Sequence, residues 1–142
     1  MKKISQKIVK STFLVDALIS CGFGIVSFLI PHQTYGTIIA IPPSNEALFL
    51  AILASMSILY ILIGLIAVIG WKAPYPIAIW IAVLMLIRHS WLGIMKTMDI
   101  NQEWIVGDPY PDIVIHSLFA LVYTVGIIYS TKHRKKVDIS AS

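Results

Sequence analysis

Four long apolar stretches limit what this chain can fold into more than any other feature. They run over residues 12–30, 46–70, 77–98 and 112–130, with proline-rich or polar segments between them. A helix needs roughly 20 apolar residues to cross the hydrocarbon core of a bilayer, which is about 30 Å thick. Proline ends such helices because it lacks an N–H donor and clashes with the preceding turn. The sequence therefore predicts an all-α fold, a four-transmembrane-helix bundle in which residues 1–142 form a single integral membrane domain.

The composition excludes several other classes of protein. Of the residues, 58% are apolar and only 13% are charged, whereas about a quarter of the residues in a soluble domain are charged. The single cysteine, Cys21, excludes an intramolecular disulfide, a CxxC redox pair and a multi-cysteine metal site. The net charge of +4 is divided between the two ends of the chain and forms no stripe interleaved with aromatic residues, so no nucleic-acid partner is expected.

The positions of the basic residues predict the topology. Four bases precede the first apolar stretch and four follow the last one: Lys2, Lys3, Lys7, Lys10, Lys132, Arg134, Lys135 and Lys136. The short turn between the second and third stretches carries Lys72, and the two longer loops carry no Lys or Arg. Because basic loops stay in the cytoplasm, both termini and the Lys72 turn are predicted to be cytoplasmic. We expect a multi-pass protein of a bacterial inner membrane, with the lipid bilayer as its first partner.

Away from the ends of the predicted spans lie four charged or histidine residues, namely Asp16, Arg88, His89 and His116. Such a residue costs a few kcal/mol in hydrocarbon and is a functional hypothesis by default. Arg88 is the deepest charge, and its long side chain can reach Asp16 across the first and third spans. Their pair is interpreted either as a structural ion pair, which neutralises two costly charges, or as part of a proton relay.

The third and fourth spans carry a further set of polar residues. His89 and Lys96 share one helical face, and His116 shares a face with Tyr123. We expect these four residues, together with Arg88, to line a pocket that opens toward the outer leaflet and binds a small lipophilic molecule with a polar head. The alternative is that the side chains satisfy one another and enclose nothing.

Signatures of catalysis are missing from the sequence. No Ser or Cys lies in a nucleophile elbow, and neither a phosphate loop nor a dinucleotide fingerprint is present. His89 and His116 lack a neighbouring carboxylate at matching depth, which is too little for a zinc or iron site. The sequence therefore favours a protein that is not an enzyme, assigns no catalytic or metal-binding residue and leaves its cofactors open.

Two segments carry a resemblance to a known family. Residues 88–96, RHSWLGIMK, followed by the polar entry into a last helix over residues 108–119, resemble the DoxX-like small four-helix membrane proteins. The resemblance implies a compact four-helix bundle and carries over Arg88, His89 and Lys96 without a catalytic role. Some members are linked to quinone-coupled sulfur oxidation or to membrane-bound oxidoreductase assemblies. This chain departs from a thiol relay because it has one cysteine.

Two functional hypotheses follow. The first is a membrane subunit or binding module whose polar interior holds a small lipophilic molecule such as a quinone, or which docks a redox partner protein. The second is a proton-coupled transporter that uses Asp16 with His89 or His116 as the relay. A transporter with four spans normally has to dimerise to enclose a path, so the second hypothesis predicts a homo-oligomer.

Overall fold

The structure, a computed structural model, describes residues 2–35, 46–98, 100 and 108–139. Within these ranges the chain forms five helices, α1 Lys2–Leu29, α2 Pro31–Tyr35, α3 Glu46–Lys72, α4 Tyr75–Met98 and α5 Tyr110–Ile139. Four of them contain segments long and apolar enough to cross a membrane: Gln6–Leu29, Leu50–Lys72, Tyr75–Met98 and Tyr110–Tyr129. The predicted helical fold, with four helices that could cross a membrane, is thus confirmed for the described residues.

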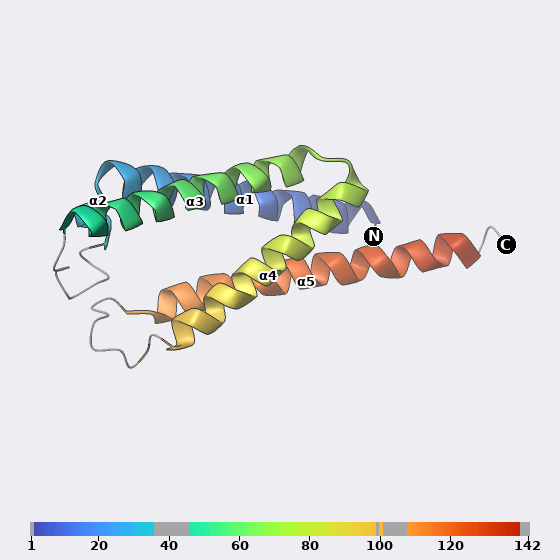
Figure 1. Ribbon diagram of the computed structural model, residues 1–142. Coiled ribbons are helices and arrows are strands. Elements are labelled where there is room, and N and C mark those ends of the chain that lie inside the picture. Colours follow the sequence, from blue (N-terminus) through green and yellow to red (C-terminus); the bar gives the residue numbers. More distant parts are fainter. Residues whose placement is uncertain (1, 36–45, 99, 101–107, 140–142) are drawn as a thin grey trace.

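The side of the membrane on which the termini lie stays a prediction. The side chains of residues 2–5 and 130–139, which include most of the terminal bases, lie outside the described ones, and so do residues 36–45 and 101–107 of the two longer loops. The structure does place the start of α1 and the end of α5 at the same end of the bundle (Figure 1).

α1 begins ten residues before the first predicted span, and α5 ends nine residues after the last one. The starts of α4 and α5 differ from the predicted spans by two residues each, for a reason that concerns proline. α4 and α5 each begin one residue before a proline, Pro76 and Pro111, and α2 begins at Pro31 itself. The first turn of a helix tolerates proline because the N–H groups there have no intrahelical acceptor. Asp108 accepts a hydrogen bond from the Tyr110 backbone N–H at 3.0 Å and so caps the start of α5. The short helix α2 was not predicted.

The four long helices are arranged as two hairpins. α1 packs mainly on α3, and α4 packs mainly on α5. We call the end of the bundle with the short turn between α3 and α4 the turn end, and the opposite end, where α1 ends and α3 begins, the loop end. Between the two hairpins, α1 contacts α5 and α3 contacts α4. The hairpins lie together toward the turn end and diverge toward the loop end (Figure 1).

Small residues allow α1 and α3 to approach closely. A Cβ atom at Gly64 would lie 2.9 Å from the Cys21 backbone nitrogen, and one at Gly24 would lie 2.7 Å from the Ser57 carbonyl oxygen. Cys21 Sγ itself lies 3.7 Å from the Ile61 carbonyl oxygen. Close backbone approach at small residues is a common source of stability between membrane helices.

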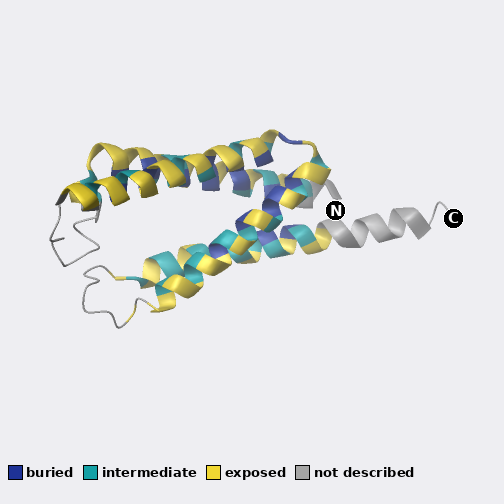
Figure 2. Cartoon of the chain, in the orientation of Figure 1, coloured by how far each residue is buried: buried dark blue, intermediate teal, exposed yellow. Residues whose placement is uncertain are grey.

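The apolar core lies in the half of the bundle nearer the turn end. Val9 and Phe13 of α1 are fully buried there, and Phe13 packs against Tyr123 of α5 with ring centroids 5.4 Å apart. Figure 2 shows the buried residues between the helices and exposed residues over the outward faces. Many of the exposed residues are large and apolar, which suits helices whose solvent is lipid.

Candidate intramembrane polar site

A buried carboxylate, Asp16 of α1, forms the centre of the candidate site. It accepts hydrogen bonds from four side chains. Oδ1 lies 3.0 Å from Arg88 Nη1 and 3.1 Å from Ser20 Oγ, and Oδ2 lies 2.9 Å from His89 Nε2 and 3.1 Å from the Tyr123 hydroxyl. Asp16 is only 1% exposed. Such dense hydrogen bonding offsets the cost of removing a carboxylate from water.

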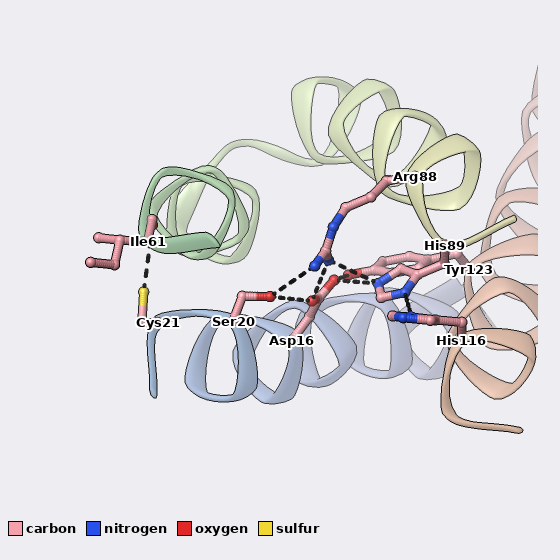
Figure 3. Close-up of polar contacts among 8 residues, drawn as sticks. All are labelled: Asp16, Ser20, Cys21, Ile61, Arg88, His89, His116 and Tyr123. Atoms are coloured by element: carbon pink, nitrogen blue, oxygen red, sulfur yellow. Dashed lines mark hydrogen bonds and ion pairs between the residues drawn. The ribbon is translucent and has the colours of Figure 1, made fainter. Parts of the chain in front are cut away.

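These residues and His116 are called the polar cluster below, and three helices supply them (Figure 3). α1 contributes Asp16 and Ser20, one turn apart on the same face; α4 contributes Arg88 and His89, and α5 contributes His116 and Tyr123. On α1 the cluster follows directly after the core residue Phe13, on the side toward the loop end. It therefore joins the two hairpins close to the place from which they diverge.

Arg88 connects α4 with both helices of the other hairpin. Its ion pair with Asp16, which the sequence analysis expected, is formed at 3.0 Å. Arg88 Nη2 also donates to Ser20 Oγ at 3.3 Å, and Cζ lies 5.9 Å from the centre of the Tyr60 ring on α3. The Nε atom is buried without a hydrogen-bond partner. A buried ion pair costs desolvation energy, which its attraction repays only with good geometry and further hydrogen bonds, so Ser20 and Tyr60 support the pair.

The two histidines extend the cluster away from the carboxylate. His89 Nδ1 and His116 Nδ1 lie 3.0 Å apart. One of these nitrogens therefore carries a proton and donates a hydrogen bond, and the other accepts that hydrogen bond. Arg88 Nη1 lies 3.3 Å from His89 Nε2, but the contact of this nitrogen with Asp16 is shorter, at 2.9 Å. Because an ionised carboxylate only accepts, we assign the proton on His89 Nε2 to the hydrogen bond with Asp16. Phe119 stacks on the His89 ring with centroids 4.6 Å apart and holds its orientation. Asp16, His89 and His116 thus form one continuous line of hydrogen bonds.

Burial differs sharply along this line. Asp16 and His89 are at most 2% exposed, and Tyr123 is fully buried. His116 is partly exposed and uses Nδ1 within the cluster, which leaves Nε2 for another partner. His116 is therefore the member of the histidine pair through which the cluster can exchange a proton or a hydrogen bond with its surroundings.

Of the five residues that were predicted to line one pocket, the structure brings four together and places Lys96 apart from them. Arg88, His89, His116 and Tyr123 come together around Asp16, whereas Lys96 Nζ lies 3.5 Å from Asp112 Oδ2. Lys96 and Asp112 are partly exposed and lie nearer the loop end. The predicted ligand-binding role of these residues stays a prediction.

A groove of about 560 Å³ lies between α1 and α5, on the surface of the bundle. It is a different place from the predicted pocket, since its walls include neither histidine of the cluster. The lining residues on which the argument below depends are Lys7, Ser11, Val15, Ile19, Leu118 and Phe119. Phe119 separates the groove from the cluster, because the same ring stacks on His89.

The sequence analysis missed this groove and the role of Phe119. On α1 the groove follows a stripe with a spacing of four residues, Lys7, Ser11, Val15 and Ile19, which was visible in the sequence. The partner helix was not visible, because no local pattern states that α1 contacts α5. For metal binding, no group of three or more His, Cys, Asp or Glu side chains with suitable geometry occurs among the described residues.

Comparisons of the chain with protein-family models, with curated proteins and with solved structures each give no match.

Proposed function

We propose that this protein is a membrane binding module whose polar cluster presents His116 to a small lipophilic molecule with a hydroxyl or carbonyl head, such as a quinone. The observation that carries the proposal is the hydrogen-bonded line from Asp16 through His89 to the partly exposed His116. The resemblance of residues 88–96 to DoxX-like proteins, some of which are linked to quinone chemistry, agrees with it.

The line can serve either kind of head group. With His89 neutral, His116 Nδ1 donates to His89, and His116 Nε2 can accept a hydrogen bond from a ligand hydroxyl. With one more proton on the pair, His89 Nδ1 donates to His116, and His116 Nε2 can donate to a ligand carbonyl. The two states differ by one proton on the histidine pair. A quinol would offer its hydroxyl to the first state and a quinone its carbonyl to the second. The conversion of one into the other needs two electrons as well as two protons and is not part of this proposal.

The buried members of the cluster fit the role of support. A histidine ring at a binding site works best when its other nitrogen is held by a fixed partner, since that partner sets the tautomer. His89 provides that partner for His116, and Asp16 provides it for His89. Ser20, Arg88 and Tyr123 in turn fix the carboxylate.

Photo-crosslinking with an azido-quinone tests the proposal in protein reconstituted into lipid nanodiscs. We expect His116→Phe, which keeps a ring of similar size, to lower labelling at least tenfold, which corresponds to about 1.4 kcal/mol of binding free energy. His32→Phe, on the short helix α2 near the loop end, is the matched control and should label like the wild type. Unchanged labelling in both His116→Phe and His89→Phe would remove the site.

A second function, proton-coupled transport, is favoured by a separate observation. The ion pair between Asp16 and Arg88 joins two hairpins that diverge on one side of it. Protonation of Asp16 would remove its attraction for Arg88 and weaken this joint, which couples proton binding to movement of the hairpins. A four-span transporter would act as an oligomer.

Flux in proteoliposomes decides between the two functions. A transporter would move a lipophilic cation such as ethidium only when a pH gradient is imposed, and Asp16→Asn would abolish that movement. Chemical cross-linking of the same proteoliposomes would show a dimer. Gradient-independent ethidium distribution, together with quinone labelling that depends on His116, would instead favour the binding module.

A further inference from the structure

We propose that the groove between α1 and α5 binds one anionic phospholipid of the leaflet that faces the turn end. Its phosphate lies at Lys7 and Ser11, and one acyl chain follows the groove toward the middle of the bundle. The proposal does not depend on the function of the polar cluster, because the groove has its own lining on the far side of Phe119.

The groove has the size and accessibility of a lipid-binding site. Its volume of about 560 Å³ falls within the range of small-molecule sites, roughly 300–1,000 Å³. Val15, Ile19 and Leu118 are each about half exposed, so the groove is reached from the lipid phase. A molecule that enters it need not leave the bilayer.

The order of residues along α1 matches the polarity of a lipid. Lys7 and Ser11 lie at the end of the groove nearer the turn end, and Val15 and Ile19 follow on the same face. At about 1.5 Å per residue, the rise from Lys7 to Ile19 is about 18 Å. This is close to half the thickness of the hydrocarbon core, which is about 15 Å. The groove therefore has the length of the chains of one leaflet.

Charge selects an anionic head group. Lys7 is the charged residue in the groove lining, and Lys10 lies one turn further along α1. No acidic residue precedes Asp16 in the chain, and Asp16 is engaged by Arg88 and His89 in the buried cluster. Basic residues at a membrane boundary attract anionic lipids. A zwitterionic lipid would place a second cation beside Lys7 and should bind less well.

Leu118 and Phe119 of α5 form the opposite wall of the groove. Leu118 points outward and is 55% exposed, whereas Phe119 packs inward on His89. A larger residue at position 118 would therefore fill the groove without entering the polar cluster. This gives a variant that tests the acyl chain separately from the phosphate.

Native mass spectrometry of the full chain, released from nanodiscs, tests the proposal. The probes are phosphatidylglycerol and phosphatidylcholine with identical acyl chains. We expect the wild type to retain one phosphatidylglycerol and at least tenfold less phosphatidylcholine. Lys7→Gln should lower the retained phosphatidylglycerol about tenfold, while Lys10→Gln, a matched neutralisation on the same helix outside the groove lining, should retain it.

Leu118→Trp should lower retention of both lipids, and helicity by circular dichroism shows that each variant is folded. Equal loss in Lys7→Gln and Lys10→Gln would mean general surface attraction and would overturn the site, as would equal retention of the two lipids by the wild type. Displacement of the phospholipid by added quinone at the same residues would reassign the groove to quinone. His116→Phe should leave lipid retention unchanged, so failure here is distinguishable from failure of the proposed function.

Discussion

His89 and His116 face each other across the hairpin of α4 and α5, with their Nδ1 atoms 3.0 Å apart. Two imidazole rings in this arrangement share a single proton, and the second nitrogen of His89 is already committed to Asp16. A ligand that hydrogen-bonds to the partly exposed His116 is therefore linked, through His89, to a carboxylate that is itself buried. This relationship is the basis of the proposed function and leads to the first prediction.

The shared proton is directly observable. In protein with ¹⁵N-labelled histidine, solid-state NMR should show scalar coupling between the two Nδ1 nuclei across the N–H···N hydrogen bond, and a protonated His89 Nε2. His116→Phe should abolish the coupling while His89 Nε2 stays protonated, because Asp16 still accepts from it. Two unprotonated Nδ1 nuclei in the wild type would contradict the relay.

Removal of one partner of the ion pair between Asp16 and Arg88 should destabilise the protein more than removal of both partners. We expect Asp16→Ala to lower the free energy of unfolding by about 3–5 kcal/mol, because Arg88 is left buried without its counter-charge. The double variant Asp16→Ala with Arg88→Met should recover most of this loss, since no buried charge remains. Reversible unfolding in mixed micelles measures both. A double variant as unstable as the single one would show that the loss does not come from the unpaired charge.

The Tyr123 hydroxyl should stabilise the carboxylate measurably. Tyr123→Phe removes one donor to Asp16 and keeps the ring that packs on Phe13. We expect a loss of about 1–2 kcal/mol in the free energy of unfolding. Tyr129→Phe, at a position that is 49% exposed on the same helix, is the control and should change stability by less than about 0.5 kcal/mol. Similar losses in both variants would argue against the hydrogen bond.

Replacement of a glycine of α1 or α3 by alanine should destabilise the protein only where the two helices are in close contact. At Gly64 an added methyl group would press on the backbone and side chain of Cys21, whereas at Gly22 it would meet nothing within 4 Å. Gly64→Ala should therefore cost about 1–3 kcal/mol of stability by overpacking. Gly22→Ala should be neutral or slightly stabilising. The same unfolding experiment compares the two, and equal effects would mean that the helices can separate slightly without cost.

The topology can be tested at two exposed positions at opposite ends of the bundle. Lys72→Cys lies at the last residue of α3, beside the turn that leads to α4, and Asp108→Cys lies before α5. If basic segments stay in the cytoplasm, a membrane-impermeant maleimide added to intact cells should label position 108 and spare position 72. Labelling after lysis should reach both. The reverse pattern in intact cells would invert the predicted orientation.

The sequence by itself determined the helical class and the number of apolar helices, and it predicted that Arg88 would pair with Asp16. The length of an apolar stretch is a local property, and the bilayer converts it directly into a crossing helix. The cost of a lone charge in hydrocarbon is equally general, so two opposite charges at reachable depths are expected to pair. Neither inference needs to know how the helices are rotated about their axes.

Only the tertiary structure decided which polar groups share a partner. Ser20, His89 and Tyr123 meet on the carboxylate of Asp16, whereas Lys96, on the same face of α4 as His89, lies apart from it beside Asp112. The tertiary structure likewise decided that a groove forms between α1 and α5 and that Phe119 lies between this groove and His89. The rotation and crossing of helices are set by close packing at small residues such as Gly64 and by side chains far apart in the chain. A pattern read along one helix cannot specify those contacts, because they depend on the shape of the neighbouring helix.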